Sequence, residues 1–159
     1  MNSKSKTTRV ARPSTKTVLL VDDDPSVREM IGRVLADEGY HVLRAANGLE
    51  GIEIASANSI DLVLLDLNMP GKGGWDTFER ITSENPNLAV VIITAKPDQL
   101  FTSLAAGVGA LLEKPLDFNR LLKTVRDLLN EPAERRLGRL TGKESILRYH
   151  SPTRKEPGA

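Results

Sequence analysis

Segments rich in apolar residues recur at regular intervals along the chain and constrain its fold more than any other feature. They cover residues 18–21, 41–46, 62–65, 88–93 and 110–112. Four of the five contain no polar residue at all, which is typical of strands buried on both faces of a parallel sheet. We therefore expect five central strands.

Each of these segments is followed by apolar residues at helical spacing. After the first, Asp24 and Pro25 are suited to cap and open a helix, and Gly39 is suited to end it. The later helices are expected to begin at Asn47, near residue 75, at Pro97 and after Asp117. Strands that alternate with helices predict an α/β fold, namely a doubly wound, five-stranded parallel sheet with helices on both faces.

Charge divides the chain into a central part and two basic ends. Residues 1–17 hold five cations and no acid, and residues 131–159 hold seven cations and four acids. Residues 18–130 are acidic, which makes nucleic acid an unsuitable partner for them. We expect a flexible basic arm over 1–16, one domain over 17–130, and a basic tail over 131–159 that is mostly flexible but could form a short helix.

Several classes of protein are disfavoured by what the sequence lacks. It contains no cysteine, which excludes disulfides, thiolate metal sites and a cysteine nucleophile. Its longest apolar runs are far shorter than the roughly 20 residues needed to cross a bilayer, and no apolar signal segment is present. A cytoplasmic protein without membrane contact is therefore expected.

Polar residues with reactive side chains follow four of the predicted strands. Asp22 and Asp23 follow the first strand, Asp66 the third, Thr94 the fourth and Lys114 the fifth. The carboxyl ends of parallel strands meet at one edge of the sheet, where α/β proteins bind ligands. Three carboxylates held close together repel one another unless a cation neutralises them. Mg²⁺ is the expected cofactor, because it suits a site with few carboxylates plus waters and a phosphate.

This set of residues is also suited to phosphoryl transfer. That reaction needs an oxygen nucleophile, a metal and cations around the phosphoryl oxygens. Asp66 is the natural nucleophile. Lys114 would place a positive charge on a phosphoryl oxygen, and Thr94 would offer a hydroxyl donor.

Four short motifs contain these residues. They are Val-Asp22-Asp23, Asp66-Leu-Asn-Met-Pro-Gly, Ile-Ile-Thr94-Ala and Glu-Lys114-Pro115. In order and spacing they resemble the receiver domain of two-component response regulators, of the stand-alone type, over about residues 17–130. The resemblance implies the flavodoxin-like strand order 2-1-3-4-5 and a cis bond between Lys114 and Pro115.

The resemblance also implies a role for each residue of the site. Asp66 would accept a phosphoryl group from a histidine kinase or phosphotransfer protein. Asp23, Asp66 and the backbone carbonyl of Asn68 would bind Mg²⁺, with Asp22 acting through water. Lys114 would pair with the phosphoryl oxygens, and Thr94 would move toward them. No catalysis is expected beyond Mg-dependent self-phosphorylation and autodephosphorylation.

The output of the expected signal would be a contact with an unknown downstream protein. The surface of the fourth helix, fifth strand and fifth helix is the expected contact face, and two copies could also pair there. The family often has an aromatic residue on the fifth strand, three positions before the lysine. Here that position is Leu111, so we expect a smaller switch or one that uses backbone motion.

Two other functions are compatible with parts of the sequence. The pair Asp22 and Asp24 resembles the nucleophile motif of haloacid-dehalogenase-type phosphatases, although Ser26 departs from that pattern and no room is left for a cap domain. Alternatively, the basic ends could bind nucleic acid under control of the phosphorylated domain. The receiver interpretation uses every residue of the strand-end set and is preferred.

Overall fold

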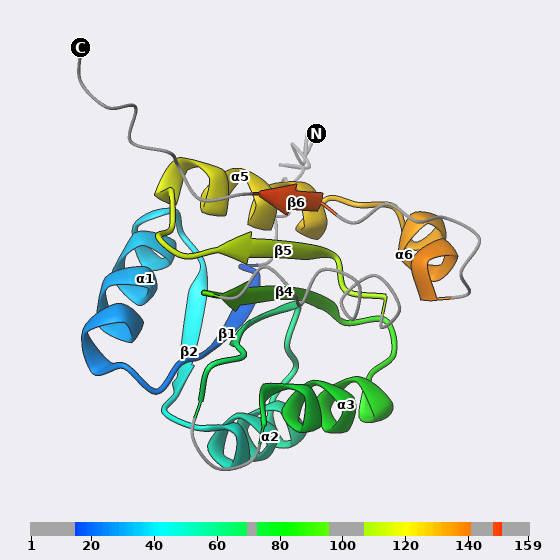
Figure 1. Ribbon diagram of the computed structural model, residues 1–159. Coiled ribbons are helices and arrows are strands. Elements are labelled where there is room, and N and C mark those ends of the chain that lie inside the picture. Colours follow the sequence, from blue (N-terminus) through cyan, green and yellow to red (C-terminus); the bar gives the residue numbers. More distant parts are fainter. Residues whose placement is uncertain (1–14, 70–72, 96–106, 141–147, 151–159) are drawn as a thin grey trace, which may run out of the picture.

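The computed structural model describes residues 15–69, 73–95, 107–140 and 148–150. The strands are β1 (Thr17–Val21), β2 (His41–Ala45), β3 (Leu62–Asp66), β4 (Ala89–Thr94), β5 (Ala110–Glu113) and β6 (Arg148–His150). The helices are α1 (Pro25–Asp37), α2 (Gly48–Ala57), α3 (Gly74–Glu84), α5 (Phe118–Leu129) and α6 (Ala133–Leu140). Strands and helices alternate from β1 to α3 (Figure 1).

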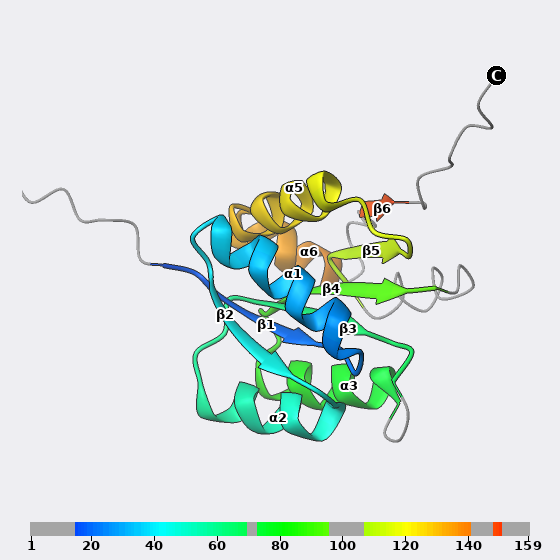
Figure 2. The same cartoon turned by 90° about the vertical axis from the view of Figure 1, so that its left-hand side faces the viewer.

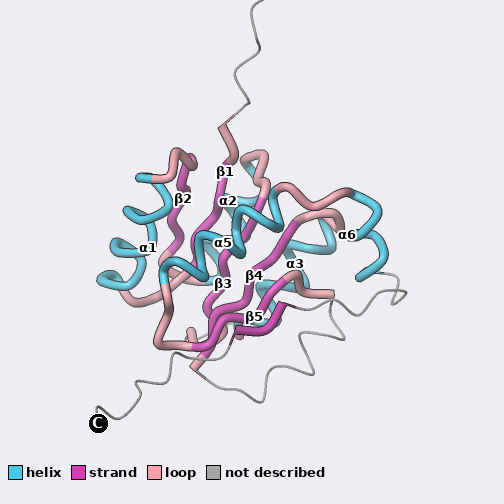
Figure 3. Tube along the Cα trace, turned by 90° about the horizontal axis from the view of Figure 1, so that it is seen from above, coloured by secondary structure: helices cyan, strands magenta, loops and turns pink. Residues whose placement is uncertain are grey.

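All of the strands lie in one sheet, in the order β2-β1-β3-β4-β5-β6. Every neighbouring pair is parallel, and the order from β2 to β5 can be followed from above in Figure 3. The predicted order 2-1-3-4-5 is confirmed. The sixth strand was not predicted, because three residues are too short to carry a recognisable strand pattern.

Helices cover both faces of the sheet. Helices α1 and α5 lie on one face and α2 and α3 on the other (Figure 2). Strand side chains alternate between the two layers. Val18, Leu20 and Leu64 pack with α1 and α5 in one core, while Leu19 and Leu65 contribute to the other. Strands β3 and β4 are buried at every position, as the unbroken apolar runs predicted.

Local signals account for most helix boundaries. Asp24 caps α1 by accepting hydrogen bonds from the N–H groups of Ser26 and Val27, and Asp117 caps α5 in the same way. Gly39 follows α1 with a φ of 92°, the left-handed region that glycine adopts most readily. No helix in the described ranges is long and apolar enough to cross a membrane.

The structure differs from the sequence prediction in a few boundaries. Strand β2 ends at Ala45, one residue earlier than predicted, and β4 runs from Ala89 to Thr94 rather than over 88–93. The predicted helix that begins at Pro97 lies outside the described residues, as does most of the basic arm. Helix α6 forms within the tail, where a short helix was considered.

Candidate functional site

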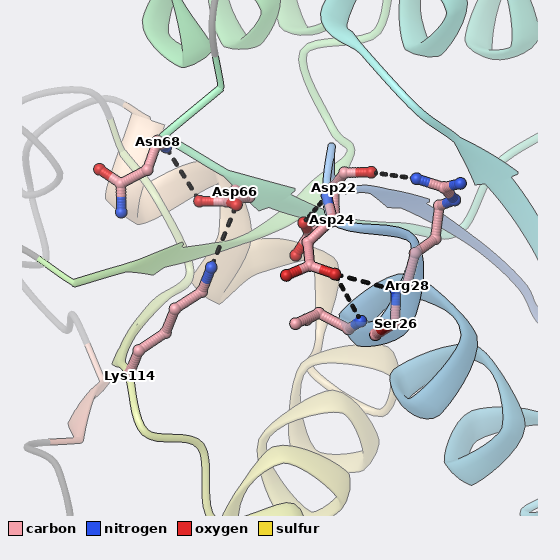
Figure 4. Close-up of polar contacts among 8 residues, drawn as sticks. Asp22, Asp24, Ser26, Arg28, Asp66, Asn68 and Lys114 are labelled. Atoms are coloured by element: carbon pink, nitrogen blue, oxygen red, sulfur yellow. Dashed lines mark hydrogen bonds and ion pairs between the residues drawn. The ribbon is translucent and has the colours of Figure 1, made fainter.

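The predicted strand-end residues meet at the carboxyl edge of the sheet. Asp22 directly follows β1, Asp66 ends β3, Thr94 ends β4 and Lys114 follows β5. Parallel pairing brings these ends together, since the Lys114 N–H donates a hydrogen bond to the Thr94 carbonyl over 2.9 Å. Figure 4 shows Asp66 and Lys114 facing one another, with Asp22 nearby. Adjacent strands thus supply one compact polar site.

Asp66 is held by two hydrogen bonds. Its side chain is 2 % exposed. Its Oδ1 atom accepts a hydrogen bond from the Asn68 N–H over 2.9 Å, and its Oδ2 atom accepts one from Lys114 Nζ over 3.1 Å. The Lys114 side chain, at 28 % exposure, reaches the site from the surface. Asp66 is therefore an oriented carboxylate with a cation already beside it.

Asp22 is buried, and only one of its two carboxylate oxygens has a hydrogen-bond partner among the described residues. Its Oδ1 atom accepts a hydrogen bond from the Asp24 N–H over 2.9 Å. Its buried Oδ2 atom has no hydrogen-bond partner among the described residues. Burial raises the pKa of Asp22; the nearby Asp66 and Asp23 add to this, and the Asp24 N–H and Lys114 oppose it. Such an oxygen is destabilising unless another group contacts it.

The three carboxylates of the site could share one metal ion. Asp22, Asp23 and Asp66 each offer an oxygen, and these oxygens lie within 4.8 Å of one another. Carboxylate oxygens are the ligands preferred by a hard divalent cation such as Mg²⁺. A cation there would also neutralise the mutual repulsion and give the Asp22 Oδ2 atom a partner. The residues present fit a magnesium ion.

The other predicted residues lie close by. Asn68 is beside Asp66 through its backbone N–H, with an exposed side chain. Thr94 is fully buried, as is Leu111, where the family often has an aromatic residue. The bond between Lys114 and Pro115 is cis, as predicted. A ligand role for the Asn68 carbonyl stays a prediction.

Two residues that support the site were not predicted. Arg28 Nη1 donates a hydrogen bond to the Asp22 carbonyl over 2.8 Å, and a cation so near a helix N-terminus, where it is electrostatically unfavourable, was the available signal. Gly74 opens α3, and a Cβ atom there would lie 2.7 Å from the Leu67 Cα atom. Glycine therefore allows α3 to begin directly against the chain that follows Asp66.

Asp24 has a structural role that needs no metal. Its Oδ1 atom accepts hydrogen bonds from Ser26 N–H at 2.9 Å and Val27 N–H at 3.3 Å, both at the start of α1 (Figure 4). The phosphatase interpretation requires this carboxylate to act in catalysis. The capping contacts instead account for Asp24 as the N-cap of the helix.

The sequence was compared with known families and curated proteins. The model of the response regulator receiver domain matches residues 18–126. The transcriptional regulatory protein GlrR of Escherichia coli K12 is 36% identical over 119 residues, which are 73% of this chain and 27% of GlrR. Sporulation initiation phosphotransferase F of Bacillus subtilis 168 is 33% identical over 114 residues, which are 70% of this chain and 92% of that protein. The chain thus spans about a quarter of GlrR but nearly all of the phosphotransferase.

Solved structures show the same fold. A CheY-like receiver domain from Methanospirillum hungatei JF-1 has a TM-score of 0.72 at 29% identity, over 77% of this chain and 98% of its own. The response regulator TrrA of Thermotoga maritima, solved in complex with Mg(2+)-BeF, has a TM-score of 0.67 at 30% identity, over 72% of this chain and 99% of its own.

Proposed function

Because the chain belongs to the response regulator receiver domain family, we propose that it accepts a phosphoryl group on Asp66 in a Mg-dependent reaction. The donor is a histidine kinase or phosphotransfer protein, and the signal passes to a protein partner by conformational change. The observation that carries this proposal is the Asp66 carboxylate, oriented by Lys114 and Asn68 beside the half-satisfied Asp22. Residues 17–130 form the receiver, between a basic arm and a basic tail.

Magnesium is the proposed cofactor. The carboxylates of Asp23 and Asp66 would hold it together with the Asn68 backbone carbonyl, and Asp22 would act through water. The ion supplies positive charge to the phosphoryl oxygens. The unpartnered Asp22 Oδ2 atom supports this assignment, and the neighbour solved with Mg(2+)-BeF supports the same class of ligand.

The proposed chemistry is a transfer between a phosphohistidine and Asp66. A carboxylate oxygen of Asp66 attacks phosphorus, an O–P bond forms, and the N–P bond to the donor histidine breaks. Lys114 Nζ shifts from the carboxylate onto the phosphoryl oxygens, and the Thr94 hydroxyl donates a hydrogen bond to them. Water later hydrolyses the acyl phosphate to inorganic phosphate and regenerates Asp66.

An apolar groove beside the site supports a protein phosphodonor. It runs between α1 and the turn that joins β5 to α5, and it contains Lys114. Its other lining residues are Val27, Met30, Ile31, Pro115, Leu116 and Phe118. Met30 is 48% exposed despite its apolar side chain, and such residues at a groove are typical of a partner contact. A donor protein bound in this groove would lie next to Lys114, whose Nζ atom contacts Asp66.

The downstream contact is proposed on the face formed by the fourth helix, β5 and α5, where two copies could also pair. A phosphoryl group adds a dianion at Asp66 and so favours a different arrangement of nearby segments. The fourth helix lies outside the described residues. Leu111 is fully buried in β5, so the proposed switch moves backbone rather than an aromatic side chain.

Incubation with acetyl phosphate and Mg²⁺ tests the proposed acceptor. The intact mass should increase by one phosphoryl group, and the increase should be absent in Asp66→Asn and after chelation of the metal. Asp24→Asn is the matched control, because it replaces a neighbouring carboxylate but retains a residue that caps helices. It should be labelled like the wild type. Equal labelling of Asp66→Asn would exclude Asp66 as the acceptor.

A further inference from the structure

The outer edge of β5 is covered by a segment from the C-terminal tail. Strand β6 pairs in parallel with β5, with Ala110 opposite Arg148 and Leu112 opposite His150. Figure 1 shows the short strand lying along β5, beside α5. The edge of a sheet presents unpaired N–H and C=O groups that bind extended chains. The tail satisfies these groups of β5 within the same molecule.

An arginine side chain of helix α6 forms hydrogen bonds with the domain. Arg136 Nη1 donates a hydrogen bond to the Asn87 carbonyl over 2.8 Å, and Nη2 donates one to the Leu128 carbonyl over 3.2 Å. Leu128 lies in the last turn of α5, and its carbonyl also accepts a hydrogen bond from the Glu131 N–H over 3.3 Å. Arg136 therefore joins the end of α5 to the turn before β4. Within the part of the tail that the structure describes, α6 and β6 both contact the domain.

The strand that receives β6 also leads into the phosphorylation site. Lys114 follows the end of β5 directly, and its Nζ atom bonds Asp66. The last residue of β5 that pairs with β6, Leu112, lies two positions before Lys114. A phosphoryl group places its oxygens farther from the Asp66 backbone than the carboxylate oxygens that Lys114 now contacts. If Lys114 follows them and draws the end of β5 with it, the three-residue pairing with β6 has few hydrogen bonds to resist that shift.

We propose that the outer edge of β5 is a strand-binding site occupied by residues 148–150 of the same chain, and that phosphorylation of Asp66 releases them. Release then uncovers the β5 edge, which belongs to the proposed downstream contact face. The proposal rests on the proposed function of Asp66. By linkage, pairing of β6 must disfavour the phosphorylated state by the same factor by which phosphorylation disfavours pairing.

The pairing is tested in the full chain with two double variants. Successive N–H groups along a strand point to opposite sides, so Arg148→Pro with Tyr149→Pro removes at least one donor that faces β5. Arg148→Ala with Tyr149→Ala is the matched control, because it removes the same side chains and keeps both N–H groups. Residue-resolved hydrogen exchange should show faster exchange of the β5 amides that face β6 in the proline pair. Equal exchange in the two pairs would overturn the proposal.

The coupling is tested by titration with beryllofluoride and Mg²⁺, a non-hydrolysable phosphoryl mimic. The proline pair should bind it at least about fivefold more tightly than the alanine pair, the lower end of coupling between sites. In the alanine pair and the wild type, the mimic should speed exchange of the β5 amides that face β6. Equal affinities would overturn the coupling while leaving the phosphoacceptor role intact. Absence of binding in every variant would overturn the proposed function and this inference together.

Discussion

At the scale of single residues, the site combines a satisfied and an unsatisfied carboxylate. Asp66 has a partner on each oxygen, whereas the buried Oδ2 atom of Asp22 has none in the described part of the chain. A protein without a ligand is destabilised by such an oxygen. This arrangement would favour cation binding at Asp22, because the ion would remove a free-energy cost that the folded protein carries without it.

Replacing Asp22 by asparagine should stabilise the metal-free protein. The pKa of Asp22 is raised by burial, so the folded state holds the proton more tightly than the unfolded state. This contribution favours folding below the unfolded pKa and is lost as the pH rises through the raised, folded value. At pH 7 in EDTA, Asp22→Asn should increase the free energy of unfolding by about 1 kcal/mol.

The stabilisation should depend on pH and metal. The advantage of Asp22→Asn should shrink as the pH falls toward 4, and shrink also when Mg²⁺ is added at pH 7, because the wild type then gains a partner for Oδ2. Denaturant unfolding checks both trends. Asp23→Asn, at an exposed neighbouring carboxylate, should change stability by less than about 0.5 kcal/mol in EDTA. A variant less stable than the wild type at pH 7 in EDTA would contradict this reasoning.

At the scale of elements, helices α1 and α6 have distinct proposed roles. Helix α1 presents the exposed Met30 at the groove next to Lys114. Helix α6 is hydrogen-bonded through Arg136 to α5 and to the turn before β4.

The groove assignment is tested with Met30→Glu. A charge on this apolar surface should slow phosphotransfer from a histidine-phosphorylated phosphotransfer protein about tenfold, since a docking contact is lost. Labelling by acetyl phosphate needs no docking and should be unchanged. Leu49→Glu is the control, because Leu49 is also exposed, at 58%, but lies on α2 across the sheet. Equal slowing by both variants would exclude the groove as the docking surface.

The contribution of the Arg136 hydrogen bonds to stability is tested with Arg136→Gln. Loss of two charge-assisted hydrogen bonds in a half-exposed setting should lower the free energy of unfolding by about 1 kcal/mol, measured by denaturant titration. Arg135→Gln, at the exposed neighbouring arginine, should leave it unchanged within about 0.5 kcal/mol. A matching loss in both variants would mean that net charge, rather than the Arg136 contacts, stabilises α6.

At the scale of the whole molecule, the sequence predicts the sheet better than its surroundings. Unbroken apolar runs such as 62–65, bounded by turn residues, are typical of central strands, and parallel strands bring Asp22, Asp66 and Lys114 to one edge. The burial that leaves Asp22 Oδ2 without a partner among the described residues depends on three-dimensional packing, as do the contacts of Arg136, and no local pattern encodes either. Strand β6 could not be predicted, because its pairing depends on the available edge of β5 more than on its own three residues.

Asp66 is the residue on which we propose that the phosphoryl group is carried. Borohydride reduces an aspartyl phosphate to homoserine, which tandem mass spectrometry can locate. After incubation of the full chain with acetyl phosphate and Mg²⁺, followed by borohydride, we expect homoserine at position 66 and none at Asp22, Asp23 or Asp24. Homoserine at one of those three positions, with Asp66 unmodified, would contradict the account.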